Sequence, residues 1–114
     1  LSLEEAASVI AASFWETIER RDEQTRKKLT YLRSLYAPLL INGPFSILLG
    51  FEGGIMALND RLKLRSMVVA EKSDRFYVAS EECAIRILEP EPDRIYAPRG
   101  GEPVIVTLRE DARV

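Results

Sequence analysis

Hydrophobic side chains recur in the first 41 residues at the three-and-four spacing that places them on one face of a helix. The first such face predicts a helix over residues 3–20. Ser2 and Glu5 have the spacing of a capping box, which stabilises a helix start by about 1 kcal/mol. The hydrophobic positions of this face are Leu3, Ala7, Ile10, Phe14 and Ile18.

A charged break at residues 20–23 separates this helix from a second hydrophobic face. The second face carries Leu29, Leu32, Leu35 and Tyr36. It ends at Pro38, because the proline ring cannot continue the helical hydrogen-bond ladder. Residues 1–41 are therefore predicted to form a helical pair, arranged as a hairpin.

After residue 42 the pattern changes to short runs that are typical of strands. Strands are predicted over residues 45–51, 55–58, 64–70, 75–79 and 104–108, with tight turns at 52–54 and 72–74 between antiparallel neighbours. Residues 80–88 predict one short helix, capped by Ser80 and stopped before Pro90. Residues 42–114 thus contribute strands with one short helix. The predicted fold class is α+β, an antiparallel sheet with a helical hairpin.

Composition narrows the class of protein. The 114 residues, 46% of them hydrophobic, suffice for one domain, or part of one, whose core needs no disulfide. Basic and acidic residues are mixed along the chain and leave a net charge of −2, which argues against nucleic-acid binding. The chain has no histidine, which excludes histidine-dependent catalysis, and the single Cys83 excludes a cysteine-rich zinc site.

The longest apolar runs fall far short of the roughly 20 residues that cross a bilayer, and nothing has the form of a signal peptide. We therefore expect a cytoplasmic protein that does not enter a membrane. Because residue 1 is leucine rather than methionine, we also expect either upstream processing or a segment of a longer polypeptide.

The residues alone offer no complete catalytic set. Cys83 falls on the apolar side of the short helix, which favours a role in core packing. Four charged residues lie where one predicted strand ends and the next begins. They could bind an anionic substrate through a guanidinium fork, or pair with one another to fix the turn, and the pairing is favoured. These four residues are Asp60, Arg61, Lys63 and Arg65.

Four segments then occur in a particular order: NGPFSI (42–47), NDRLKLR (59–65), ASEECA (79–84) and GEPVIV (101–106). They resemble ordered motifs in the second half of the class II glutamine amidotransferase (glutaminase) domain, most closely the glutamate synthase type and its archaeal-type stand-alone relatives. Residues 1–41 are similar to the helix pair that precedes these motifs in that type. Ser66 stands where the family usually has proline, and Lys63 where many members have glycine.

The resemblance implies an αββα sandwich of the N-terminal-nucleophile type. Such enzymes use the thiol of an N-terminal cysteine, with its own α-amino group, of pKa about 8, as the base. Residue 1 here is leucine, so the resemblance assigns no catalytic or substrate-binding residue, no metal and no cofactor to this chain. Flavin and iron–sulfur groups belong to other domains of glutamate synthases. Asp60, Arg65, Ser80 and Glu81 are expected to support a site completed elsewhere.

The implied function is to form the C-terminal structural portion of a glutaminase domain that supplies ammonia to a synthase. The expected partner is the N-terminal half of that domain or a synthase subunit, and a homo-oligomer is also possible. Two alternatives stay open. One is a non-catalytic interaction or regulatory module that retains the amidotransferase fold, and the other is an unrelated α+β homodimerisation domain.

Overall fold

The computed structural model describes residues 1–109. Its helices are α1 (Leu3–Ile10), α2 (Trp15–Glu19), α3 (Glu23–Leu35) and α4 (Glu82–Leu88), with a short 3-10 helix η1 at Ala37–Leu39. Its strands are β1 (Ser46–Phe51), β2 (Gly54–Asn59), β3 (Val68–Lys72), β4 (Arg75–Ala79), β5 (Arg94–Tyr96) and β6 (Val104–Thr107). Within this part of the chain, no helix combines the length and apolar character needed to cross a membrane.

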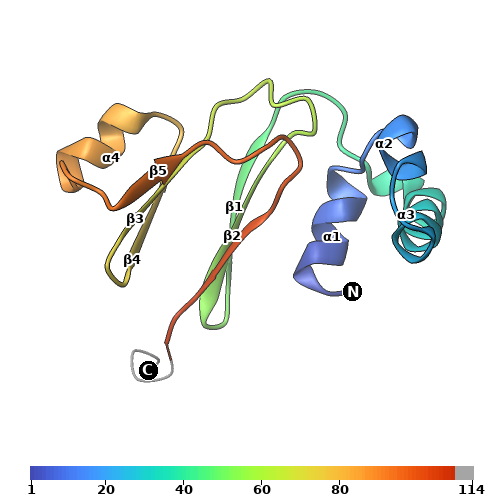
Figure 1. Ribbon diagram of the computed structural model, residues 1–114, viewed down its shortest axis with the longest axis horizontal. Helices are drawn as coiled ribbons and strands as arrows, with labels where there is room; N and C mark the ends of the chain where they lie inside the picture. Colours follow the sequence, from blue (N-terminus) through green and yellow to red (C-terminus); the bar gives the residue numbers. More distant parts are fainter. Residues whose placement is uncertain (110–114) are drawn as a thin grey trace.

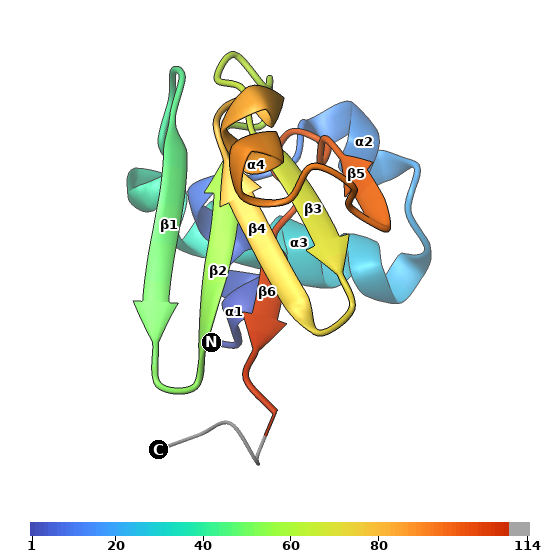
Figure 2. The same cartoon turned by 90° about the vertical axis from the view of Figure 1, so that its left-hand side faces the viewer.

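The strands form two antiparallel sheets of three strands each, in the orders β1-β2-β6 and β4-β3-β5. The two sheets are the inner layers in Figures 1 and 2. Helix α4 lies outside the β4-β3-β5 sheet, and helices α1 to α3 lie outside the β1-β2-β6 sheet. The order of layers is therefore helix, sheet, sheet, helix. The predicted α+β class is confirmed, and the antiparallel sheet is divided into two.

A hydrophobic core fills the space between α1 and the β1-β2-β6 sheet. Ala7 and Ala11 pack there against Met56 and Leu58 of β2, and all four are buried. Side chains alternate along a strand, so Met56 and Leu58 face the helix while Ala57 and Asn59 face the other sheet. The partly buried residues around this core are Leu3, Ile10, Phe45, Phe51 and Ile105.

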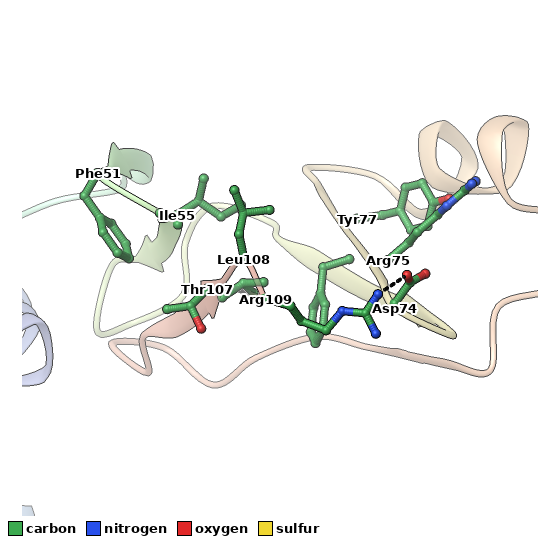
Figure 3. A pocket seen from close by; sticks show the side chains of 12 residues that line it. Phe51, Ile55, Asp74, Arg75, Tyr77, Thr107, Leu108 and Arg109 are labelled. Atoms are coloured by element: carbon green, nitrogen blue, oxygen red, sulfur yellow. Dashed lines mark hydrogen bonds and ion pairs between the residues drawn. The ribbon is translucent and has the colours of Figure 1, made fainter. Parts of the chain in front are cut away.

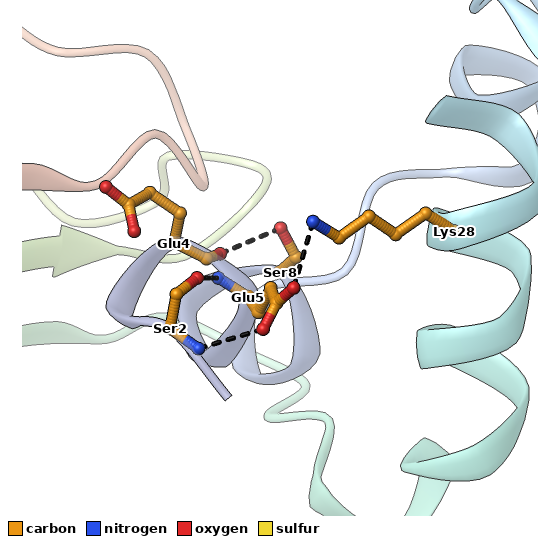
Figure 4. Close-up of polar contacts among 5 residues, drawn as sticks. All are labelled: Ser2, Glu4, Glu5, Ser8 and Lys28. Atoms are coloured by element: carbon orange, nitrogen blue, oxygen red, sulfur yellow. Dashed lines mark hydrogen bonds and ion pairs between the residues drawn. The ribbon is translucent and has the colours of Figure 1, made fainter. Parts of the chain in front are cut away.

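The predicted capping box at the start of α1 is confirmed (Figure 4). The Glu5 amide donates to Ser2 Oγ at 3.1 Å, and the Ser2 amide donates to Glu5 Oε2 at 2.8 Å. Lys28 of α3 lies 2.9 Å from the other oxygen of Glu5. The bond from Lys28, then that from Ser2, holds the pKa of Glu5 below its ordinary value. The helix start is thus tied to α3 as well as closed locally.

The single helix predicted over residues 3–20 is wrong, because the chain bends between α1 and α2. Three carbonyl groups at this bend accept hydrogen bonds from donors far away in the sequence, and those donors replace the local helical ladder. Hydrophobic spacing carries no information about such distant donors. The pairs are Ile10 O with the Ile41 amide (3.0 Å), Ala12 O with Arg61 Nη1 (3.2 Å), and Ser13 O with Arg33 Nη1.

All five predicted strands are present, and one of them begins late. The run predicted from residue 64 starts as β3 only at Val68. Strand β5 was not predicted, because the neighbouring Pro-rich stretch at 89–92 resembles an extended connector. β5 pairs with β3. Just before β5, the Asp93 amide donates to Glu71 O of β3 at 2.8 Å. Predictions that concern residues 110–114 lie outside the described residues.

Candidate functional site

The most highly organised polar feature is the turn after β2, residues 59–66, which we call the Asp60 turn. The Asp60 carboxylate is 2% exposed. It accepts the amide of Leu64 at 2.7 Å, that of Arg65 at 3.1 Å and that of Phe45 at 3.3 Å. A carboxylate that binds three backbone N–H groups holds both sides of a turn in place. Because two of these amides belong to residues 64 and 65, they cannot join a sheet ladder, which is why β3 begins later than predicted.

The predicted pairing of Asp60 with Arg61, Lys63 or Arg65 is wrong, since none of the ion pairs within residues 1–109 includes Asp60. Burial raises the pKa of Asp60, but the hydrogen bonds from the three amides outweigh it, and the pKa lies below its ordinary value. The carboxylate is therefore ionised at neutral pH, and each of its oxygens accepts at least one backbone amide. That arrangement suits a structural role, because both carboxylate oxygens are engaged by backbone amides that fix the turn.

Three of the four ordered segments meet at the Asp60 turn. Phe45, from segment 42–47, exchanges backbone hydrogen bonds with Asp60: its amide donates to the carboxylate, and its carbonyl accepts the Asp60 amide at 3.0 Å. Gly101, from segment 101–106, donates its amide to Asn59 O at 3.1 Å. A Cβ on Gly100 would lie 2.5 Å from Arg61 O and 3.0 Å from Asp60 O, so only glycine fits this close approach.

The side chain of Arg61 connects the Asp60 turn to the helical layer. Besides the bond to Ala12 O, its Nη2 donates to Asn42 Oδ1 at 3.2 Å. Its guanidinium lies over the Phe14 ring, 4.5 Å from the centroid. The sequence identified Arg61 only as a member of a charged group, so this role was missed. A long arginine just after a strand was the available signal, but its acceptors could not be inferred.

Segment 79–84 contains the predicted support residues Ser80 and Glu81. They lie apart from the Asp60 carboxylate, at the start of α4. Both are exposed. The prediction that Ser80 caps this helix is wrong, because Ser80 lies one residue before the cap position. The cap position is occupied by Glu81, whose side chain makes no capping hydrogen bond. A cavity of about 240 Å³ connects the regions, with Ser46 and Ser66 on one side and Ser80 on the other.

Arg65 acts in the Asp60 turn through its backbone. Its amide donates to Asp60, its carbonyl accepts the Asn59 side-chain amide at 3.2 Å, and its own side chain is exposed. The other end of the Asn59 side chain is unusual. Asn59 is fully buried, and its Oδ1 has no hydrogen-bond partner among the described residues. The sequence analysis did not single out Asn59 by itself, because an asparagine at a strand end is typical of turns.

The predicted burial of Cys83 is wrong. Cys83 lies on the exposed side of α4, and its thiol donates to Glu81 Oε2 at 3.3 Å. Ile85 is the buried residue of α4, so its side of this short helix contacts the sheet, and Cys83 lies on another side. Across residues 1–109, no three acidic or cysteine side chains come close enough together to hold a metal ion.

A wider groove of about 590 Å³ opens between the two sheets at the end of the molecule away from the Asp60 turn (Figure 3). Its walls are mostly apolar and include Phe51, Ile55 and Leu108. At its rim Asp74 and Arg109 form an ion pair at 3.1 Å. None of the four predicted support residues lines this groove. This groove and the convergent sequence segments are therefore at different places.

Comparison with known proteins gives one informative similarity. The chain is 43% identical over 109 residues to an uncharacterized protein from Archaeoglobus fulgidus. The match covers 96% of this chain but only 29% of that protein, so the chain corresponds to less than a third of its relative's length. No protein-family model matches the chain. No solved structure matches it either.

Proposed function

We propose that this chain is the C-terminal structural portion of a class II glutamine amidotransferase domain of the glutamate synthase type. In such a domain a cysteine thiolate attacks the carboxamide of glutamine, ammonia leaves, and water releases the glutamyl thioester. The nucleophile would come from polypeptide outside these 114 residues, because their single cysteine, Cys83, lies on an exposed helix face. The chain would supply strands, a helical layer and the Asp60 turn.

The observation that carries this proposal is the meeting of three of the four ordered segments in space, with the remaining segment beside them. Segments 42–47, 59–65 and 101–106 are joined by hydrogen bonds to Asn59 and Asp60. Segment 79–84 borders the same end of the molecule through the cavity shared by Ser46, Ser66 and Ser80. Residues that belong to one functional region of a fold must be brought together, although they are distant in the chain.

The layer order supports the same proposal. Helix, sheet, sheet, helix is the order of an αββα sandwich of the N-terminal-nucleophile type, and Figure 1 shows these layers one after another. The backbone at Lys63 agrees as well. Its φ of +53° lies in the left-handed region, which favours the glycine that many members have there. A hydrogen bond from Lys63 Nζ to Pro98 O accompanies the lysine in this chain.

In this proposal the four predicted residues act indirectly. Asp60 holds the turn through its carboxylate, and Arg65 holds it through its backbone. Ser80 lines the small cavity beside this turn, and Glu81 begins the helix that covers the second sheet. Their substitution should therefore change the stability of the assembled domain before it changes the chemistry.

The experiment is to purify the natural protein from its own cells with every chain that accompanies it, and to determine the N-terminal sequences and intact masses. We expect an N-terminal cysteine on an upstream or companion segment, and ammonia release from glutamine by the whole. The 114-residue chain alone should release none. A natural protein with no such cysteine and no glutamine-dependent ammonia release would contradict the proposal.

A second function is favoured by one observation, the uncharged and exposed edge of the β1-β2-β6 sheet described below. A non-catalytic interaction module that retains this fold would also need such a surface. The ammonia measurement separates the two functions, because an interaction module would join its partner without releasing ammonia.

A further inference from the structure

Strand β1 differs from the other strands at the edges of the two sheets. β4 carries Arg75 and is contacted by α4, β5 has only three residues and carries Arg94, and β6 has four residues. Edge strands are normally kept from pairing with other chains by such charges, covers or short lengths. β1 has six residues, and no charged residue lies between Arg33 and Glu52. It stands at the open side of its sheet in Figure 2.

The register shows which backbone groups of β1 are unused. Phe51 pairs with Gly54 across a two-residue turn, and Phe45 O accepts the Asp60 amide, so the odd-numbered residues from 45 to 51 bond to β2. The even-numbered residues Ser46, Leu48 and Gly50 therefore point their N–H and C=O groups away from β2. No described residue supplies hydrogen-bond partners for these groups.

Apart from Ser46, whose hydroxyl donates to Ser66 O, the side chains of β1 are apolar on both faces of the sheet. Leu48 is 62% exposed on the face toward the second sheet, and Leu49 is 44% exposed on the face toward the helices. A strand that is apolar on both faces is typical of the interior of a layered fold rather than of an edge.

We propose that β1 is completed by a strand from the polypeptide that accompanies this segment in the natural protein, so that β1 becomes an interior strand of a larger sheet. The added strand is uncharged and apolar on both faces, to match Leu48 on one side and Leu49 on the other. This inference rests on the proposed function in naming the missing half of the amidotransferase domain as the source of the strand.

The length of the relative favours this occupant over a second copy of the chain. In the Archaeoglobus protein the matching stretch is 29% of the polypeptide, so most of that protein lies outside the stretch and is available to cover this edge. Main-chain pairing of this kind needs no specific side chain from the partner, only an unpaired strand of suitable character.

Hydrogen exchange tests the proposal at single amides. The amides of Leu48 and Gly50 should exchange fast in the 114-residue chain and at least about tenfold more slowly in the natural protein. The amides of Ile47 and Leu49 bond to β2 in both samples and serve as internal controls. Fast exchange at Leu48 and Gly50 in both samples would overturn the proposal. Slow exchange in the isolated chain that depends on its concentration would also overturn it, because a second copy would then be the occupant.

A pair of substitutions tests the apolar character of the contact. Leu48→Lys places a charge on the edge, and Ile87→Lys places one on α4 at a side chain that is 81% exposed. Both isolated variants should fold as the original chain does. In the natural protein, Leu48→Lys should return Gly50 to fast exchange, and Ile87→Lys should not. Slow exchange at Gly50 in the Leu48→Lys variant would overturn the proposal.

The two proposals can fail separately. Slow exchange at Leu48 and Gly50 in a natural protein that releases no ammonia would leave the paired edge intact and remove the glutaminase function. Ammonia release by a protein whose Leu48 and Gly50 amides exchange fast would do the opposite.

Discussion

Asparagine in place of Asp60 changes one oxygen of a buried carboxylate into an N–H₂ group and removes the negative charge. The carbonyl oxygen of asparagine can replace the carboxylate oxygen that accepts the amides of Phe45 and Arg65. The other oxygen accepts the Leu64 amide at 2.7 Å, and in the variant two donors would face each other there. Asp60→Asn thus removes the shortest of the three bonds and weakens the other two.

The magnitude follows from the strength of bonds to buried charged groups. Each contributes about 1.5–3 kcal/mol, and an unsatisfied buried donor adds to the loss. We expect Asp60→Asn to lower the free energy of unfolding by about 2–3 kcal/mol, out of a total of about 5–15 kcal/mol for a domain. With a urea m-value of about 1–3 kcal/mol/M, the unfolding midpoint should fall by roughly 0.7–3 M.

The pH dependence provides a second readout of the same carboxylate. The pKa of Asp60 in the folded chain lies below its unfolded value of about 3.9, so its stabilisation is complete above that value. The stabilisation is lost as the pH falls through the folded-state pKa. The difference in stability between the original chain and Asp60→Asn should therefore be largest near neutral pH and should shrink in acid.

Asp74→Asn is the matched control, since Asp74 forms an ion pair with Arg109 and its side chain is 55% exposed. Exposed pairs contribute at most about 1 kcal/mol, so its midpoint should move little. Urea unfolding followed by circular dichroism measures all three proteins at several pH values. Equal midpoint shifts for the two variants, or a gap that stays constant on acidification, would refute the reasoning.

Three further outcomes are expected. Gly100→Ala should lower the free energy of unfolding in urea by about 2–4 kcal/mol, because the new Cβ would collide with backbone atoms. Gly50→Ala is the control, since open space surrounds that position, and it should lower the free energy of unfolding by less than about 1 kcal/mol. Equal losses for the two variants would contradict this reasoning. Ser73→Gly should stabilise the chain by about 0.5–1 kcal/mol in thermal unfolding, because φ is +54° there, and Ser34→Gly within α3 should destabilise it by a similar amount. The Cys83 thiol should react completely with a thiol reagent without denaturant, and protection until unfolding would contradict its exposed position.

Local chemistry made much of the fold predictable. The capping box of α1 and the hairpin turns depend on residues within a few positions of one another, and these predictions are confirmed. The end of α3 before Pro38 was also predicted, whereas Asp22, which caps its start by accepting the Thr25 amide at 3.0 Å, was recognised only as part of a charged break. Interactions between residues a few positions apart can be predicted from a short stretch of sequence.

The wrong predictions share one cause, which is competition from distant groups. The bend after α1 exists because Arg33, Arg61 and the Ile41 amide take carbonyl groups that a longer helix would have used. Strand β5 exists because β3 offers it a partner, and a run of only three residues is too short to show the alternating pattern of a strand. The hydrophobic pattern along the chain does not show which distant hydrogen-bond donor or strand will contact a given segment.

The candidate site was predictable in its residues and not in its contacts. Asp60 was singled out correctly as part of a turn, but its partners are backbone amides rather than the neighbouring arginines. Backbone donors belong to every residue, so composition cannot reveal that a carboxylate will bind three of them. The unpaired oxygen of Asn59 was equally invisible, since it depends on complete burial.

The contact between Arg61 and Ala12 joins residues 49 positions apart, and this separation has a kinetic consequence. Short-range helix formation takes about a microsecond, whereas contacts of long sequence separation form late because a large loop must close first. The bond from Arg61, the last of the three that hold the bend between α1 and α2, can form only after the β1–β2 hairpin has brought Arg61 into place. The amino-terminal layer should therefore acquire its final shape in the same slow step as the sheet beneath it, and a ribosome would have to release more than half of the chain before that layer could settle.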